Sequence, residues 1–194
     1  MITISKSEDT VNAASKIAEI LRNPGAVALV PTETVYGLVC RAADREAVEK
    51  IVQLKHRSAG KFFGWFVRDC QVAQKQGLIF TDTAKRLAAE YFPGAVTLVL
   101  PSADGGSQAI RIPDHKLISC LLEYFDEPLV QTSANASGMP DALCVEQALQ
   151  QLDGEPDVAC DGGSLPSDAA GSTVVNTTVE PPVILRQGKV VIKL

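Results

Sequence analysis

Apolar residues recur at helical spacing near the start of the chain. Within residues 8–22 they follow one face of a helix, and Asn23-Pro24-Gly25 ends the pattern with residues that a helix does not continue through. The inward positions of this predicted helix are Val11, Ala14, Ile17, Ala18 and Leu21. Residues 26–30, AVALV, form a short apolar run and are predicted to be a buried strand.

The same reading along the rest of the chain gives alternating helices and strands. Further helices are predicted over residues 44–57, 69–76, 82–91, 114–125 and 144–152. Further strands are predicted over residues 62–67, 95–100, 128–133, 157–160, 172–179, 182–186 and 189–194, and residues 105–113 are predicted to form a Gly-rich turn and a short strand. Alternation in the first two thirds, with strands gathered at the end, predicts one α/β domain over residues 1–194 with a mixed sheet. Residues 161–172 form the longest loop-like stretch inside it.

Composition narrows the function classes. The 194 residues are 46% hydrophobic and 21% charged, which fits a folded chain with a sizeable core. A formal net charge of −5 argues against a protein that coats nucleic acid, although a local basic patch stays open. The five cysteines show no C-x-x-C pair, so reduced thiols are expected rather than a disulfide framework or a zinc site.

Targeting signals and nucleotide motifs are the next features to test. The N-terminal residues contain no long apolar core of a signal peptide, and no run approaches the roughly 18 apolar residues of a membrane span. We therefore expect a cytoplasmic protein without a membrane partner. The P-loop pattern G-x-x-x-x-G-K-[ST] does not occur, so any nucleotide must be bound in another way.

Hydroxyl side chains gather where the first predicted strand ends, in VPTETVYGL at residues 30–38. If this segment stays extended, Thr32, Thr34 and Tyr36 share one face. That face suits the polar wall of a site for a small hydroxylated or carboxylated ligand. It equally suits a Thr/Tyr strand edge exposed to water, which is the more common arrangement.

Two further polar stretches lie at predicted strand ends. QTSANASG at residues 131–138 places Ser133 and Asn135 two positions apart, and GSTVV at residues 171–175 begins a strand with Ser172 and Thr173. Short side chains that both donate and accept suit ligand recognition. They also suit ordinary turns, so neither stretch is decisive alone.

The cations fall into two sets. Lys55 and Arg57 end the helix predicted over residues 44–57 and Lys61 follows it, where they complement the helix dipole or clamp a polyphosphate. Arg111 and Arg186 lie in predicted strands with apolar neighbours. Such arginines usually face solvent, and otherwise are fixed partners of a carboxylate or phosphate.

Seven stretches in one order make the chain similar to a known family. PTETVYGL, LKHR…K, FPGAVTLVL, IRIPDH, TSANASG, GSTVV and PPVILRQG resemble the motifs of the YrdC/Sua5 family over about residues 10–190. The resemblance implies the short, single-domain form, with a twisted open mixed sheet and helices around a concave, positively charged cavity. It implies nucleotidyl transfer that makes threonylcarbamoyl-AMP and pyrophosphate from L-threonine, bicarbonate and ATP.

The resemblance also implies partners and site residues. A threonylcarbamoyl transferase complex would accept the product and modify tRNA, and Mg²⁺ would arrive with ATP rather than at a dedicated protein site. The implied threonine-binding residues are Thr34, Arg111, Ser133 and Ser172. The implied ATP-binding residues are Lys55, Arg57, Lys61, Asn135 and Arg186, of which Lys55 and Arg57 would also be catalytic, and Ser107 falls roughly at another nucleotide contact.

Two departures from the family pattern keep alternatives open. The basic motif continues as KHRSAGKFFGWFV without its usual proline, and Leu143 stands near a position where the family usually has threonine. One alternative is a module that binds tRNA or double-stranded RNA through the same cations without catalysis. Another is a diverged paralogue with a different small-molecule substrate, and a purely structural α/β domain is the third.

Overall fold

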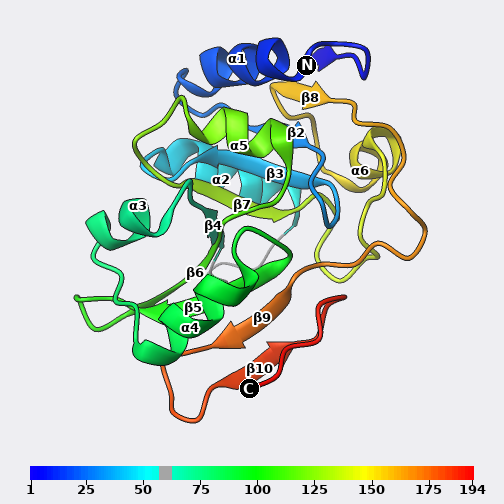
Figure 1. Ribbon diagram of the computed structural model, residues 1–194. Coiled ribbons are helices and arrows are strands. Elements are labelled where there is room, and N and C mark those ends of the chain that lie inside the picture. Colours follow the sequence, from blue (N-terminus) through cyan, green and yellow to red (C-terminus); the bar gives the residue numbers. More distant parts are fainter. Residues whose placement is uncertain (57–62) are drawn as a thin grey trace.

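Ten strands form one mixed sheet in the computed structural model, which describes residues 1–56 and 63–194 (Figure 1). The strands are β1 (Ile2–Ile4), β2 (Ala28–Val30), β3 (Gly37–Arg41), β4 (Gly64–Phe66), β5 (Val96–Pro101), β6 (Ser107–Arg111), β7 (Leu129–Ser133), β8 (Val158–Cys160), β9 (Thr173–Asn176) and β10 (Val183–Arg186). Their order across the sheet is β1-β8-β2-β3-β7-β4-β6-β5-β9-β10. The pairs β1/β8, β2/β8, β4/β6 and β5/β9 are parallel, and the other five are antiparallel.

Six helices flank this sheet in the described residues. They are α1 (Thr10–Leu21), α2 (Arg45–Leu54), α3 (Cys70–Lys75), α4 (Asp82–Tyr91), α5 (Lys116–Leu122) and α6 (Val145–Gln151). Aspartates begin several of them: the Asp9 carboxylate accepts from the Val11 and Asn12 amides, and Asp44 accepts from the Ala47 amide. Such N-caps satisfy amides that have no partner within the helix and so fix where the helix starts.

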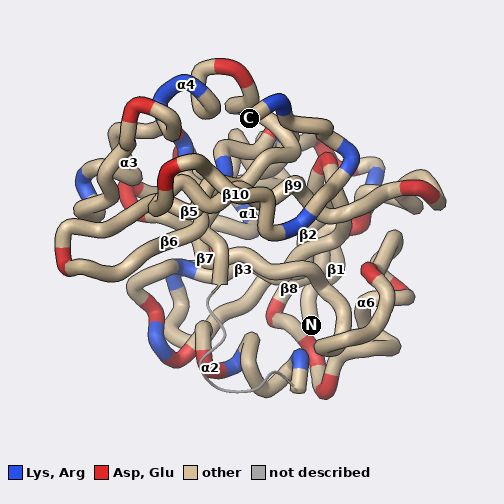
Figure 2. Tube along the Cα trace, turned by 90° about the horizontal axis from the view of Figure 1, so that it is seen from below, with Lys and Arg blue, Asp and Glu red and all other residues tan. Residues whose placement is uncertain are grey.

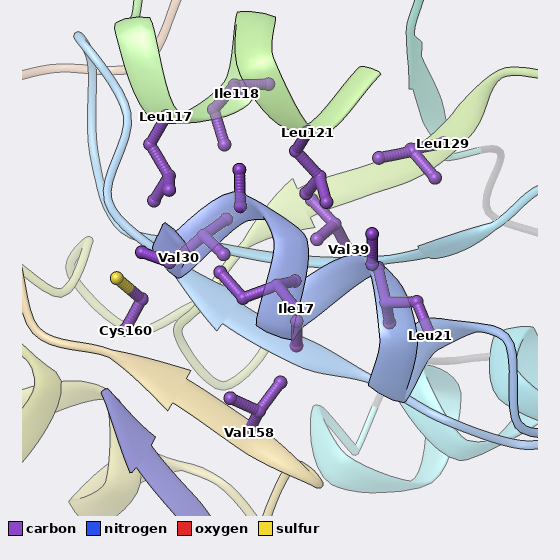
Figure 3. Packing of buried hydrophobic residues seen from close by; sticks show 14 of the residues in the cluster. Ile17, Leu21, Val30, Val39, Leu117, Ile118, Leu121, Leu129, Val158 and Cys160 are labelled. Atoms are coloured by element: carbon purple, nitrogen blue, oxygen red, sulfur yellow. The ribbon is translucent and has the colours of Figure 1, made fainter. Parts of the chain in front are cut away.

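The core lies on both faces of the sheet. Helices α1 and α5 cover one face, where Ile17, Leu21 and Ile118 meet strand residues such as Val30 (Figure 3). Helices α2 and α6 bury their apolar sides in a second cluster, to which the neighbouring Leu29 points. Consecutive residues of β2 thus face opposite layers, as a pleated strand requires. A third cluster joins α3 and α4 to β5, β6 and β9.

The predicted fold class is confirmed, because helices flank an open mixed sheet. The structure nevertheless corrects the expectation for two segments and adds two strands. Residues 31–36 do not continue the strand but form the connection between β2 and β3, and β3 itself, like β1, was not predicted. Residues 189–194 form no strand. Their alternation reflects packing instead, since Ile192 is buried against the third cluster and Val191 is exposed.

Charged positions are spread around the outside of the chain trace, with basic and acidic residues interspersed (Figure 2). This matches the modest net charge of −5. None of the helices in the described part of the chain has the length and apolar character needed to cross a membrane.

Candidate active site

A cavity of about 260 Å³ lies against β3, β7, β4, β6, β5 and β9. Its walls come from segments far apart in the sequence: the β2–β3 connection, the ends of β6 and β7, and the chain that leads into β9. Of the residues predicted to bind ligands, it is lined by Thr34, Arg111, Ser133, Ser172 and Arg186. The fold therefore brings five of these residues to one cavity.

Thr32 shapes the β2–β3 connection through its hydroxyl group. Its Oγ1 accepts from the amides of Thr34 (3.1 Å) and Val35 (3.2 Å), which turns the chain immediately after Pro31. The turn places Thr32 Oγ1 2.8 Å from Thr34 Oγ1. The two hydroxyls are thus adjacent because of a turn and not because of the extended strand that the sequence suggested.

The other partners of the two hydroxyls determine which of them donates the hydrogen bond between them. Thr32 has one hydrogen, and the Val35 carbonyl oxygen, which can only accept, lies 2.7 Å from its Oγ1. Thr34 then donates to Thr32, and Thr34 Oγ1 accepts from Nη1 of Arg111 at 3.1 Å. In this assignment the Thr34 hydroxyl has given its hydrogen to Thr32, and its remaining lone pair can accept from a donor on the ligand.

Arg111 is buried at the end of β6, with 3% of its surface exposed. Its guanidinium carbon lies 4.8 Å from the centre of the Phe66 ring, and Phe66 pairs with Arg111 in the β4/β6 register. Burial lowers the pKa of Arg111, the neighbouring Glu33 raises it, and the charge of Arg186 lowers it. Of the two interpretations of this arginine, the solvent-facing one is wrong, and a fixed partner for an anion remains.

Ser172 and Arg186 form a second polar group on the cavity. Nε and Nη2 of Arg186 donate to the carbonyl oxygen (3.0 Å) and to Oγ (3.1 Å) of Ser172. Ser172 Oγ also lies 2.7 Å from Oγ1 of the buried Thr97. The arginine and two hydroxyls hold one another, so each side chain enters the cavity in a fixed orientation.

Lys55, Ser133 and Asn135 form a third group. The Lys55 ammonium is buried and donates to the carbonyl oxygens of Ser133 and Asn135, the latter at 2.5 Å. The Ser133 hydroxyl donates to Oδ1 of Asn135, whose amide donates to the Met139 carbonyl at 2.6 Å. The cation therefore fastens the chain that leaves β7, beside the Ser133 that lines the cavity.

Two of the predicted phosphate-binding residues cannot be placed. Arg57 and Lys61 lie outside the described residues, as does most of the SAGKFF stretch that departs from the family pattern. Lys55 precedes this gap, and Phe63, which lines the cavity, follows it directly in the chain. Ser107 is exposed and is not among the cavity-lining residues.

Tyr36 joins the cavity wall to the loop at residues 161–172. Its hydroxyl accepts from the Gly162 amide and donates to the Gly163 carbonyl oxygen, both at 2.8 Å. Burial raises the pKa of Tyr36 to about 12, so the phenol keeps its proton. A Cβ at Gly162 would lie 2.7 Å from Cγ of Pro31, so this close approach requires glycine.

Several lining residues carried no clear sequence signal. Thr97 is a polar residue inside an apolar strand, and that break in the pattern is the signal that could have identified it. Gln131 and Asp141 resemble ordinary strand and loop residues. Asp141 is the one carboxylate among the described lining residues. In residues 1–56 and 63–194, no group of three or more His, Cys, Asp or Glu side chains is placed to hold a metal ion.

Comparison with known proteins gives one family. The family model Sua5_yciO_yrdC, described as "Telomere recombination", matches residues 19–188. A threonylcarbamoyl-AMP synthase from Pyrococcus abyssi is 32% identical over 182 residues, which covers 89% of this chain and 53% of the relative. The chain spans about half the length of the curated relatives that it matches first.

Two solved structures extend the comparison. The crystal structure of P. abyssi Sua5 complexed with L-threonine matches with a TM-score of 0.80 and 30% identity, covering 96% of this chain and 57% of that one. The crystal structure of Escherichia coli YciO matches with a TM-score of 0.83 and 24% identity, covering 97% and 95%. The second likeness shows a shared fold across almost the whole of both chains.

Proposed function

The chain belongs to the Sua5/YciO/YrdC family, and from this we propose that it makes threonylcarbamoyl-AMP and pyrophosphate from L-threonine, bicarbonate and ATP. The reaction would be a nucleotidyl transfer that supplies an activated group for tRNA modification. The observation that carries the proposal is one cavity lined by a buried arginine, Arg111, whose Nη1 is fixed on the Thr34 hydroxyl. The threonine bound in the Sua5 relative belongs to that protein and supports the same substrate here.

The amino acid would bind at Arg111. A guanidinium recognises a carboxylate through two parallel N–H groups, and burial at 3% exposure strengthens that interaction. Thr34 would accept a hydrogen from the amino group, because its own hydrogen is directed at Thr32. Ser133 and Ser172 line the same cavity and would contact the rest of threonine.

The nucleotide would bind toward Lys55, Asn135 and Arg186. The Lys55 ammonium binds the carbonyl oxygens of Ser133 and Asn135 and so places a positive charge next to that segment. Arg186 lines the cavity beside Ser172. We include Arg57 and Lys61 as phosphate-binding residues on their place in the sequence, between Lys55 and Phe63. Lys55 and Arg57 would stabilise the negative charge that develops at the α-phosphate.

The chemistry proceeds in two steps that need no protein nucleophile. The neutral amine of threonine adds to bicarbonate, and loss of water gives the carbamate, N-carboxy-threonine. A carbamate oxygen then attacks the α-phosphorus of ATP, and pyrophosphate leaves with the bonding electron pair. Positioning and charge neutralisation by the arginines and Lys55 would supply the rate enhancement.

Mg²⁺ would enter as a complex with the ATP phosphates, since the described residues include no cluster suited to hold it. A threonylcarbamoyl transferase complex acting on tRNA would then accept the product. The expected cytoplasmic location stays a prediction.

Pyrophosphate release tests the proposed function. The protein should release pyrophosphate from ATP only when threonine and bicarbonate are both present. Lys55→Met should reduce that release strongly, because it removes the charge beneath Ser133 and Asn135. Lys50→Met is the matched control, since Lys50 pairs with Asp157, whereas Lys55 holds the carbonyl oxygens of Ser133 and Asn135. Equal activity of the Lys55 variant and the control would contradict the assignment of Lys55.

The same experiment separates synthesis from RNA binding. A non-catalytic RNA-binding module would release no pyrophosphate and would bind RNA with an affinity that falls steeply with salt. A paralogue with another substrate would bind ATP but release pyrophosphate with a different amine. Either result would replace the proposed function.

A further inference from the structure

Glu33 lies in the β2–β3 connection between Thr32 and Thr34 and has no part in the function described so far. Its side chain is 17% exposed, and Oε1 accepts from the Asp114 amide at 3.2 Å. The other oxygen, Oε2, is buried without a hydrogen-bond partner among the described residues. A carboxylate oxygen in that position is costly unless a positive charge compensates it.

The compensating charge is Arg111. Glu33 Oε1 lies 3.8 Å from Nε of Arg111, which makes them an ion pair just beyond hydrogen-bond distance. Arg111 Nε is also buried without a hydrogen-bond partner among the described residues. The two orphaned polar groups therefore belong to one pair of side chains.

The pairing limits how the guanidinium can be used. Its Nε faces Glu33, one Nη1 hydrogen is given to Thr34, and one flat face lies over the Phe66 ring. The remaining N–H groups of Arg111 are those left for a ligand. Three neighbours thus fix the orientation of Arg111, and Glu33 is the one that carries a charge.

His115 closes the other side of this pair. It lines a second cavity of about 290 Å³ together with Glu33, Thr32 and Thr34. Its Nδ1 is buried without a hydrogen-bond partner among the described residues. Burial lowers the pKa of His115, the charge of Glu33 raises it and the charge of Arg111 lowers it. Glu33 therefore lines the second cavity, beside His115, while its ion-pair partner Arg111 lines the first.

We propose that Glu33 is a positioning residue for amino-acid binding: its carboxylate holds the Nε edge of Arg111 and so directs the other N–H groups at the carboxylate of the bound amino acid. The inference rests on the proposed function only in that Arg111 receives an amino acid. Glu33 also offsets the mutual repulsion of Arg111 and Arg186, whose charges affect each other across the same cavity. Glu33 is not among the residues that line the 260 Å³ cavity, so its effect would reach threonine through Arg111.

The test compares threonine binding and ATP binding by calorimetry in the unchanged protein and in Glu33→Gln. The amide keeps the size of the side chain and can still accept from the Asp114 amide, but it lacks the charge. Threonine should bind about tenfold more weakly, the order expected for loss of one charge-assisted contact. ATP binding should stay within about twofold, whereas a general loss of structure would weaken both ligands.

Glu127→Gln is the matched control. Glu127 pairs with Nε of Arg41 at 2.6 Å, both side chains are partly buried, and neither lines the cavity. The Glu127→Gln variant therefore loses a Glu–Arg pair elsewhere in the molecule and should bind threonine like the unchanged protein. Equal threonine affinity in Glu33→Gln and Glu127→Gln would overturn the proposal.

A double-mutant cycle asks whether Glu33 acts through Arg111. In an Arg111→Lys background, Glu33→Gln should change threonine affinity by less than twofold, because the group that Glu33 orients is already gone. Full additivity of the two changes would contradict the positioning role.

Product formation, measured on the same proteins, separates this inference from the proposed function. If threonine binds and Glu33→Gln weakens it while no threonylcarbamoyl-AMP forms, the positioning role stands and the synthase proposal fails. If product forms and Glu33→Gln binds threonine like the unchanged protein, the synthase proposal stands and the positioning role fails. Absence of threonine binding to the unchanged protein would overturn both.

Discussion

Arg111 is the residue on which the amino-acid end of the site depends. It is buried, fixed by Thr34 on one side, and stacked on Phe66. A lysine at this position would keep a positive charge but lose the planar group that can hold Thr34 and a ligand carboxylate together.

Arg111→Lys should therefore lower threonine affinity at least tenfold, because hydrogen bonds between charged groups contribute about 1.5–3 kcal/mol. The loss of ATP affinity should be much smaller, since ATP is assigned to the Lys55 and Arg186 side of the cavity. Calorimetry with each ligand in turn would show this split. Unchanged threonine binding would remove Arg111 from its assigned role.

His115 should make the free energy of unfolding depend on pH. Burial lowers the pKa of His115, Glu33 raises it, Arg111 lowers it and Asp114 raises it, with a net shift below the usual value of 6.5. The folded state therefore resists protonation, and between the folded pKa and about 6.5 the unfolded state binds more protons. The free energy of unfolding should fall as pH decreases through that window.

His115→Gln should flatten this dependence. Denaturant unfolding at pH 7.5 and at pH 5 would measure the loss of stability in both proteins, and the loss should be smaller in the variant. An identical loss in His115→Gln would show that another group titrates.

The residue types in the site could be predicted from the sequence, but their interactions could not. Thr34, Arg111, Ser133 and Ser172 stand out as polar residues at strand ends, and they do meet at one cavity. An extended strand would have placed Thr32 and Thr34 on one face, whereas the Thr32 hydroxyl makes a turn of that segment. Competition between a local hydroxyl–amide turn and a strand is not visible in alternation alone.

At the scale of elements, the C-terminal part of the chain closes one wall of the cavity. The backbone at Gly188 lies against residues 171–173: a Cβ there would lie 2.6 Å from the Thr173 amide nitrogen and would also overlap the Gly171 carbonyl oxygen. The Gly188 amide donates to Thr173 Oγ1 at 2.9 Å. The position of Ser172 thus depends on a glycine that follows β10.

Gly188→Ala should push residues 171–173 away and move Ser172. Overpacking against backbone should destabilise the protein by about 1–3 kcal/mol and weaken substrate binding as well. Thermal unfolding and calorimetry on the same sample would test both effects. Gly106→Ala is the control, because the nearest atom to its Cβ is Oδ1 of the exposed Asp104 at 3.2 Å. Gly188→Ala behaving like Gly106→Ala would contradict this packing argument.

Long amphipathic segments were predictable, as were the short apolar strands β2, β4 and β8, whereas β1 and β3 were not. The helices α1, α2 and α4 lie within the predicted ranges or match them, because several turns of helical spacing give a clear signal. The strand β1 has three residues and the strand β3 follows a turn, so neither offers enough alternation to be recognised. Residues 189–194 alternate like a strand without joining the sheet, since packing alone can produce that pattern.

For the whole molecule, the α/β class followed from the order of elements, but the site did not. The cavity combines the connection after β2 with the ends of β6 and β7 and with the segment before β9, and nothing in the spacing of these segments brings them together. The strand order β3-β7-β4-β6-β5-β9 is what makes them neighbours. The resemblance to a family implied a shared cavity before the structure was considered. The periodicity of apolar residues alone could not predict it.

The measurement that tests the central claim most directly follows labelled bicarbonate. The protein is incubated with ATP, L-threonine and ¹⁴C-bicarbonate, and the products are separated by chromatography. We predict label in threonylcarbamoyl-AMP, formed in equal amount to pyrophosphate, absent when threonine is omitted, and strongly reduced at low threonine when Arg111 is replaced by lysine. Labelled carbon that stays in bicarbonate while ATP and threonine both bind would contradict the account.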